Sequence, residues 1–143
     1  METRRQAHCV YRCEYHVVWV TRYRHKVLVN NVQTYLWLKL QEVRKLYPEI
    51  EFIEHSIQPE HVHLVLSFPP KFSLAKVVNI LKSNTAKATR DKFDFIKNRY
   101  RGGVGMWSVG YFASTVGLDE NMIRNYVLYQ GKEDSGQAKL ESI

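Results

Sequence analysis

The stretch PEHVHLVLSFPP, Pro59 to Pro70, places two histidines inside an apolar run bounded by prolines. Because neighbouring residues of a strand point to opposite faces, this run predicts a β-strand with one fully apolar face. That face carries Val62, Leu64, Leu66 and Phe68. The opposite face carries His61, His63, Val65 and Ser67. The apolar face supplies the core, so the histidines lie on the side that the core does not need.

The two histidines can be read in two ways. Residues two apart on a strand lie roughly 6.5–7 Å apart, so both imidazoles can lean onto one divalent ion. For this stretch alone, the simpler interpretation is a pair of partly exposed histidines that are hydrogen-bonded to their neighbours. A metal site also needs a third ligand from elsewhere in the chain.

Length and composition indicate a single soluble domain. The chain has 143 residues, of which 45% are hydrophobic, enough for a core. No apolar run approaches a membrane span, and Met1–Ala7 lacks the apolar stretch of a signal peptide. Cys9 and Cys13 are too far apart along a strand to bridge, and they form no zinc-binding spacing, so we expect reduced thiols. These features predict a cytoplasmic protein.

Charge and aromatic content favour a nucleic-acid partner. The formal charge is +7, and 13% of the residues are aromatic, nine of them tyrosine. Positive side chains attract a phosphate backbone, and rings stack on unpaired bases. A solvated basic face explains any single one of these residues equally well. The candidate DNA contacts are Arg22, Tyr23, Arg24, Lys26, Lys82, Lys87, Arg90, Arg99, Tyr100 and Arg101.

Periodicity along the rest of the chain predicts three more strands and three helices. The strands are expected at Tyr11 to Val20, which alternates like a half-buried strand, at Ile50 to Gln58, and at Tyr111 to Val116. The first helix starts at Asn30 or Asn31 and stops before Pro48, and Ser73 caps the second. The last helix starts at Asp119 or Glu120 and runs to Gln130, with Gly131 as its stop.

The resulting order, β-α-β-β-α-β-α, predicts an α+β fold. Two helices that cross between strands suggest a ferredoxin-like, RRM-like antiparallel sheet with an added C-terminal helix. We expect Asp91 to Gly110 to be irregular and basic. A single domain is expected over residues 1–131, followed by a polar tail over residues 132–143.

The last helix supplies two further candidates. Tyr126 and Gln130 are four residues apart, so they stand on one helical face, one turn apart. Taken alone, this spacing is more typical of a helix resting on the sheet, with Tyr126 at the edge of the core.

Together these blocks resemble a known family. His61-Val62-His63, the helix with Tyr126 and Gln130, and WSVGYFASTVG before that helix are similar to the TnpA-type insertion-sequence transposases. These are the single-tyrosine, His-hydrophobic-His (HUH) enzymes that move single-stranded DNA. The similarity extends from YHVVWVTRYRHKVL to IRNYVLYQ, most of the chain. It departs mildly at Glu60, where the family usually has aspartate.

The resemblance implies the site and its chemistry. His61, His63 and Gln130 would hold magnesium or manganese, and Tyr126 would attack a DNA phosphate, leaving a 5′-phosphotyrosine and a free 3′-hydroxyl. Two imidazoles and an amide leave the charge of the ion uncompensated, so an anionic phosphate can complete its ligand set. The substrate would be single-stranded DNA with hairpins. The family further implies a prokaryotic homodimer in which the helix serves the partner's histidines, while the spacing leaves cis and trans sites open.

Three other classes fit less of the sequence. A non-catalytic RRM-like binding module shares the element order, but it gives no reason for the histidine pair, Tyr126 or Gln130. A two-histidine phosphoesterase needs a second His-x-Thr/Ser element, and a structural zinc protein needs a fourth ligand. No GxxxxGK[ST] loop is present, so we expect no nucleotide cofactor.

Overall fold

A computed structural model describes the backbone of residues 4–6, 9–11 and 13–136, and the side chains of residues 13–136. Its centre is a four-stranded antiparallel sheet in the order β4-β5-β3-β6. The strands are β3 (Tyr15–Val20), β4 (Glu51–Ile57), β5 (His61–Ser67) and β6 (Phe112–Ser114). This order and the connecting helices are those of a ferredoxin-like sheet, which confirms the predicted α+β fold.

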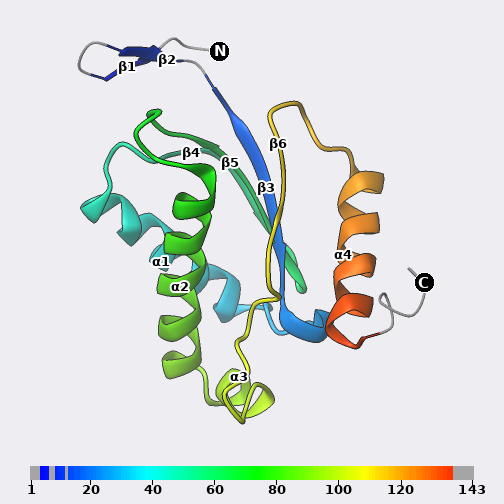
Figure 1. Ribbon diagram of the computed structural model, residues 1–143. Coiled ribbons are helices and arrows are strands. Elements are labelled where there is room, and N and C mark those ends of the chain that lie inside the picture. The colour runs from blue at the N-terminus through cyan, green and yellow to red at the C-terminus, as the bar shows by residue number, and fades with distance from the viewer. Residues whose placement is uncertain (1–3, 7–8, 12, 137–143) are drawn as a thin grey trace.

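Helices cover both faces of this sheet (Figure 1). Helices α1 (Asn31–Leu46) and α2 (Leu74–Lys92) pack on one face, and α4 (Glu120–Asp134) lies on the other. The main core lies between the sheet and the α1–α2 layer, where Trp19, Leu64, Leu36 and Leu81 are fully buried. No helix in the described part of the chain is long and apolar enough to cross a membrane.

The first predicted strand differs from the structure. Residues 9–11 form a separate strand, β2 (Cys9–Tyr11), paired with β1 (Arg4–Gln6) in a hairpin outside the main sheet. The single alternating strand expected from Tyr11 to Val20 is therefore shorter, and only Tyr15–Val20 belongs to the main sheet. Strand β3 is also not half-buried: Val17 and Trp19 face the main core, while Val18 and Val20 are buried on the opposite face, beside α4.

The helix starts follow the predicted caps more closely than the helix ends. Ser73 and Asp119 accept hydrogen bonds from the backbone N–H of Lys76 and Met122, which satisfies orphan donors at the first turns. Asn30 occupies the N-cap of α1, but its side chain makes no capping bond. The segment Asp91 to Gly110, expected to be irregular, completes α2 and includes a short helix, α3 (Asp94–Arg99).

Gly131 does not stop the last helix, because α4 continues to Asp134. A Cβ atom at Gly131 would lie 3.4 Å from the Arg24 Cβ, so the helix passes close to the segment that carries Arg24 at this glycine. The stop falls at Gly136, whose φ of +81° is the left-handed conformation that glycine adopts without strain. Residues 137–143 of the predicted tail lie outside the described residues.

Candidate active site

The histidine strand lies where its pattern predicts. Val18 pairs with His63 and Val20 pairs with His61, so both imidazoles share the sheet face that α4 covers. Val62, Leu64, Leu66 and Phe68 belong to the core on the opposite side. Both histidines are half-buried, which leaves each ring partly accessible while its strand is fixed from both edges.

Glu60 fixes the ring of His61. Its Oε1 lies 2.8 Å from His61 Nδ1, and both side chains are largely shielded from solvent. A carboxylate on Nδ1 favours the tautomer with the proton on that nitrogen, so Nε2 keeps its lone pair. The acidic residue before the histidine pair therefore has an orienting role that the sequence pattern did not reveal.

His63 carries a buried ring nitrogen without a partner. Its Nε2 makes no hydrogen bond within the described part of the chain. Burial lowers the pKa of His63, and the neighbouring His16 and His61 lower it further. The His16 ring lies 5.9 Å from it, centroid to centroid, a neighbour that sequence reasoning missed although His16 alternates correctly in its strand. The expected form of His63 is the neutral imidazole that a metal ion binds.

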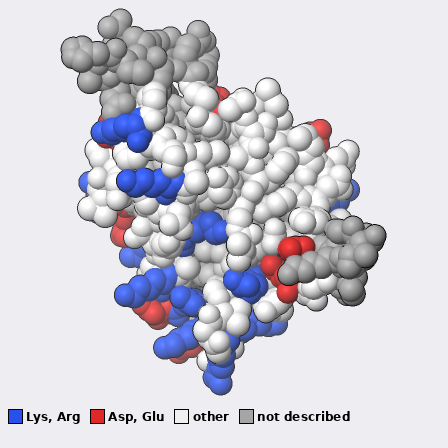
Figure 2. Space-filling view, viewed as in Figure 1, with Lys and Arg blue, Asp and Glu red and all other residues white. Residues whose placement is uncertain are grey.

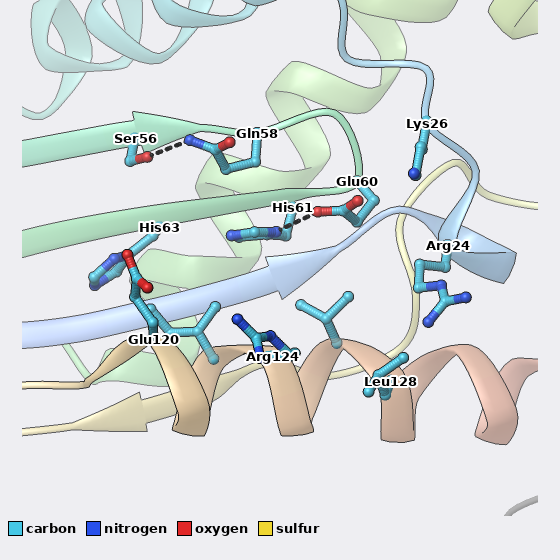
Figure 3. Close-up of a pocket in the computed structure, with 12 residues that line it drawn as sticks. Arg24, Lys26, Ser56, Gln58, Glu60, His61, His63, Glu120, Arg124 and Leu128 are labelled. Atoms are coloured by element: carbon cyan, nitrogen blue, oxygen red, sulfur yellow. Dashed lines mark hydrogen bonds and ion pairs between the residues drawn. The ribbon is translucent and has the colours of Figure 1, made fainter.

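The two histidines line a cavity of about 600 Å³ between the sheet and α4 (Figure 3). Its wall is mixed: basic side chains stand beside the imidazoles, and α4 contributes both charged and apolar residues. The lining residues are Arg24, Lys26, Ser56, Gln58, Glu60, His61, His63, Glu120, Ile123, Arg124, Val127 and Leu128. Glu120 and Arg124 were not singled out from the sequence.

Tyr126 lies on a different side of α4. Its ring stacks on Phe112 of β6, with centroids 5.5 Å apart and planes at 21°, and it does not line the histidine cavity. Burial raises the pKa of Tyr126 to about 12, and the negative charge of Asp134 adds to the rise. In this position the phenol is protonated and shielded by β6.

Gln130 is also outside the cavity. The residue is only 6% exposed, and its Nε2 donates a hydrogen bond of 3.2 Å to Oδ1 of Asp134. One chain thus brings together two of the expected ligands and holds the third, with the expected nucleophile, on another side of the helix. Within the described residues, no group of three His, Cys, Asp or Glu side chains could hold a metal ion.

The donor atoms themselves suit a divalent metal. Glu60 occupies Nδ1 of His61, which leaves its Nε2 as the nitrogen available to a metal, and among the described residues the buried Nε2 of His63 has no hydrogen-bond partner. Unpartnered buried nitrogens are costly unless something binds them. The two imidazoles therefore fit a metal ion, but the set needs further ligands from outside this pocket.

The predicted DNA-contacting residues separate into two groups. Three of them use their charge inside the protein, holding carbonyl oxygens of the segment 104–110. Arg22 Nε donates to Gly105 O at 2.9 Å, and Arg90 Nη1 to Val104 O at 3.4 Å. Lys82 Nζ donates to Ser108 O and Gly110 O, both at 2.8 Å, and burial lowers its pKa to about 8.

The other basic candidates are open to a ligand. Arg24 and Lys26 are exposed and line the histidine cavity, and Lys87, Arg99 and Arg101 are exposed elsewhere. Tyr100, by contrast, is buried, and its hydroxyl donates to Arg22 O at 3.0 Å. Figure 2 shows Lys and Arg gathered over the end of the molecule where α3 lies.

Tyr23 is 42% exposed within a short 3₁₀ turn, η1 (Arg22–Arg24). Tyr23 and Arg24 both have positive φ, 60° and 57°, a conformation that is rare for residues other than glycine and is enriched at functional sites. The turn thereby presents one exposed ring and one exposed guanidinium beside the cavity.

Comparison with known proteins identifies the family. The family model described as "Transposase IS200 like" matches residues 9–130. The chain therefore belongs to the IS200-like transposases, and it is a DNA transposase of the TnpA type, as the sequence blocks indicated.

Individual relatives agree with this assignment. The chain is 27% identical to the transposase of insertion sequence IS200 from Salmonella typhimurium, over 90% of this chain and 83% of the relative. It is 34% identical to the ISDra2 transposase TnpA of Deinococcus radiodurans, over 75% of each chain.

Two solved structures share its fold. A crystal structure described as a transposase from Deinococcus radiodurans superposes with a TM-score of 0.76 at 28% identity, over 89% of this chain and 97% of that one. A REP-associated tyrosine transposase bound to a REP hairpin gives a TM-score of 0.56 at 15% identity, over 97% of this chain and 77% of that one. The second likeness concerns the fold alone.

Proposed function

We propose that this transposase cleaves and rejoins single-stranded DNA at hairpin-bearing element ends, in the cytoplasm of a prokaryotic cell, through a covalent intermediate on Tyr126. The observation that carries the proposal is the histidine strand, which directs two metal-competent imidazoles into a cavity lined by Arg24 and Lys26. Hairpin recognition is supported by the structural neighbour, which is described as bound to a REP hairpin.

The chemistry needs a nucleophile and no energy cofactor. The Tyr126 hydroxyl loses its proton and attacks the scissile phosphorus, and the bond from phosphorus to the 3′-oxygen breaks. The 3′-oxygen leaves as a hydroxyl after taking up a proton, while the 5′-phosphate stays bonded to the tyrosine. A 3′-hydroxyl from another strand end then reverses the step, so the phosphodiester bond energy is conserved.

His61, His63 and Gln130 would hold the divalent ion, magnesium or manganese. When bound, it would polarise the scissile phosphate and stabilise the leaving 3′-oxygen. Arg24 and Lys26 would neutralise the DNA backbone at the same cavity, and Glu60 would keep the His61 Nε2 directed at the site.

A second copy of the chain would complete the site. Tyr126 and Gln130 share α4 but do not line the histidine cavity of their own chain, and Tyr126 is stacked on Phe112 with a raised pKa. An α4 helix that leaves this position and docks beside the partner's histidines would deliver nucleophile and third ligand together. We therefore propose a homodimer with trans active sites.

Incubation with labelled hairpin single-stranded DNA and Mn²⁺ or Mg²⁺ tests the proposal. We expect a covalent protein–DNA adduct that survives denaturation, and its loss in Tyr126→Phe and His61→Ala because these remove the nucleophile and a ligand. Lys45→Ala, an exposed change on α1, is the matched control and should retain the adduct. An adduct that persists in Tyr126→Phe would contradict the assignment of the nucleophile.

A further inference from the structure

Asp134 occupies the last turn of α4 and joins three segments of the chain. Its Oδ1 accepts the hydrogen bond from Gln130 Nε2 at 3.2 Å. Its Oδ2 accepts a hydrogen bond from the Tyr23 backbone N–H at 2.8 Å and lies in hydrogen-bond contact with the Ser108 hydroxyl. Both oxygens of the carboxylate are therefore engaged, which fixes its plane.

A carboxylate imposes a direction on a neighbouring amide. The two ends of the Gln130 side chain are chemically unlike: Nε2 only donates hydrogen bonds and Oε1 only accepts them. An ionised Asp134 only accepts, so the amide nitrogen must turn toward it. The amide oxygen then turns away from Asp134, and oxygen is the end of an amide that binds hard divalent cations.

We propose that Asp134 is a positioning residue for Gln130, holding its amide so that Oε1 is presented to the metal ion. The inference rests on the proposed ligand role of Gln130 and adds a residue outside the family's matched blocks. Because Gln130 and Asp134 lie one turn apart on the same helix, their hydrogen bond is internal to α4. This bond can therefore be kept when α4 moves, whereas the contacts of Asp134 with Tyr23 and Ser108 belong to the position of the helix in this structure.

Direct metal binding separates this role from a structural one. Full-length Tyr126→Phe protein is mixed with hairpin single-stranded DNA, so that complexes assemble but do not react, and free Mn²⁺ is measured by electron paramagnetic resonance. We expect Asp134→Ala to raise the Mn²⁺ dissociation constant by about tenfold or more, the effect typical of lost support for a ligand. Asp119→Ala, which removes the cap at the other end of α4, is the matched control and should leave Mn²⁺ binding unchanged.

A charge exchange at the pair gives a second, independent readout. In Gln130→Glu the new carboxylate faces Asp134 with no hydrogen to donate, so repulsion should turn it away and weaken Mn²⁺ binding. Adding Asp134→Asn restores a donor opposite the carboxylate, so the double variant should bind Mn²⁺ more tightly than Gln130→Glu alone. A purely structural Asp134 predicts no such rescue.

The outcomes separate the positioning role of Asp134 from the ligand role of Gln130. If Gln130→Ala weakens Mn²⁺ binding but Asp134→Ala does not, and the double variant shows no rescue, the positioning role is overturned and the proposed function stands. If Gln130→Ala binds Mn²⁺ as its parent does, Gln130 is not a ligand, and the proposed ligand set fails together with the inference.

Discussion

Single buried side chains determine how the molecule responds to alkaline pH. Lys82 of α2 contacts segment 104–110, Tyr100 contacts η1, and Tyr126 of α4 packs against β6. Burial lowers the pKa of Lys82 from 10.5 to about 8 and raises the pKa values of Tyr100 and Tyr126 from 10.0 to about 12. Each shift favours the neutral side chain in the folded state.

These shifts predict a maximum in stability near pH 10. Between pH 8 and about 10.5 the unfolded chain binds more protons at Lys82, so the free energy of unfolding rises with pH. Above pH 10 the folded chain retains tyrosine protons that the unfolded chain loses, so the free energy falls toward pH 12. Chemical denaturation over pH 7–12 measures both limbs.

Two variants test which residue causes the rise and which causes the fall of the free energy of unfolding with pH. Lys82→Met should flatten the rise, because no ammonium group then needs to be desolvated. Tyr100→Phe should reduce the fall, although it also loses a hydrogen bond worth about 1 kcal/mol at every pH. Unchanged slopes in both variants would show that other groups control the alkaline response.

At the scale of elements, α4 passes close to η1 at Gly131. A single methyl at this position meets Arg24 Cβ at 3.4 Å, which is an ordinary van der Waals distance. Gly131→Ala should therefore stabilise the protein by about 0.5–1 kcal/mol, because alanine has the higher helix propensity. Gly131→Leu should destabilise it, because the longer side chain must displace the turn.

Thermal unfolding of the two variants checks this prediction. Asn125→Ala, at an exposed position of α4, is a control for changes on the exposed surface of the helix. A lower midpoint for Gly131→Ala than for the parent would show that α4 and η1 are packed more tightly than the contact distance implies.

The elements also show what periodicity can predict. The 3.6-residue pattern of α1 and α2 and the alternation of β5 depend on burial against one partner, which local sequence records directly. The double burial of β3 depends on α4, more than a hundred residues away, although the apolar run Val17–Val20 carries its signal. The sequence predicts a helix stop at Gly131, and this prediction is wrong because local sequence does not record the approach of Arg24.

In the candidate site, too, local sequence predicts some features, and others depend on contacts between distant residues. The outward direction of His61 and His63 follows from strand alternation alone, and the structure confirms it. The spacing of Tyr126 and Gln130 predicts one helical face, but it carries no information on which neighbours that face meets. The four-residue spacing of Gln130 and Asp134 is present in the sequence, but only the structure shows that the Gln130 amide donates to this carboxylate.

At the scale of the whole molecule, the separation of Tyr126 from the histidines predicts complementation between subunits. Neither Tyr126→Phe nor His63→Ala should form the adduct alone. Co-refolded mixtures should recover adduct formation, since some dimers pair an intact helix with an intact histidine strand. Adduct yield on hairpin DNA measures the recovery.

The control is a sample refolded in the same way from Tyr126→Phe subunits alone. It contains no nucleophile and should stay inactive. Dimers are confirmed by light scattering before each assay. A confirmed mixed dimer without activity would contradict the trans arrangement and favour a site completed within one chain.

The internal engagement of Arg22, Lys82 and Arg90 changes how the basic composition bears on DNA affinity. A cation that is held inside the protein by hydrogen bonds to backbone carbonyls displaces no counterion from DNA. Each neutralised phosphate of a single strand contributes about −0.7 to the slope of log affinity against log salt. The salt sensitivity of this transposase is therefore set by its exposed cations, such as Arg24 and Lys26. The formal charge of +7 is therefore a better guide to solubility than to DNA affinity.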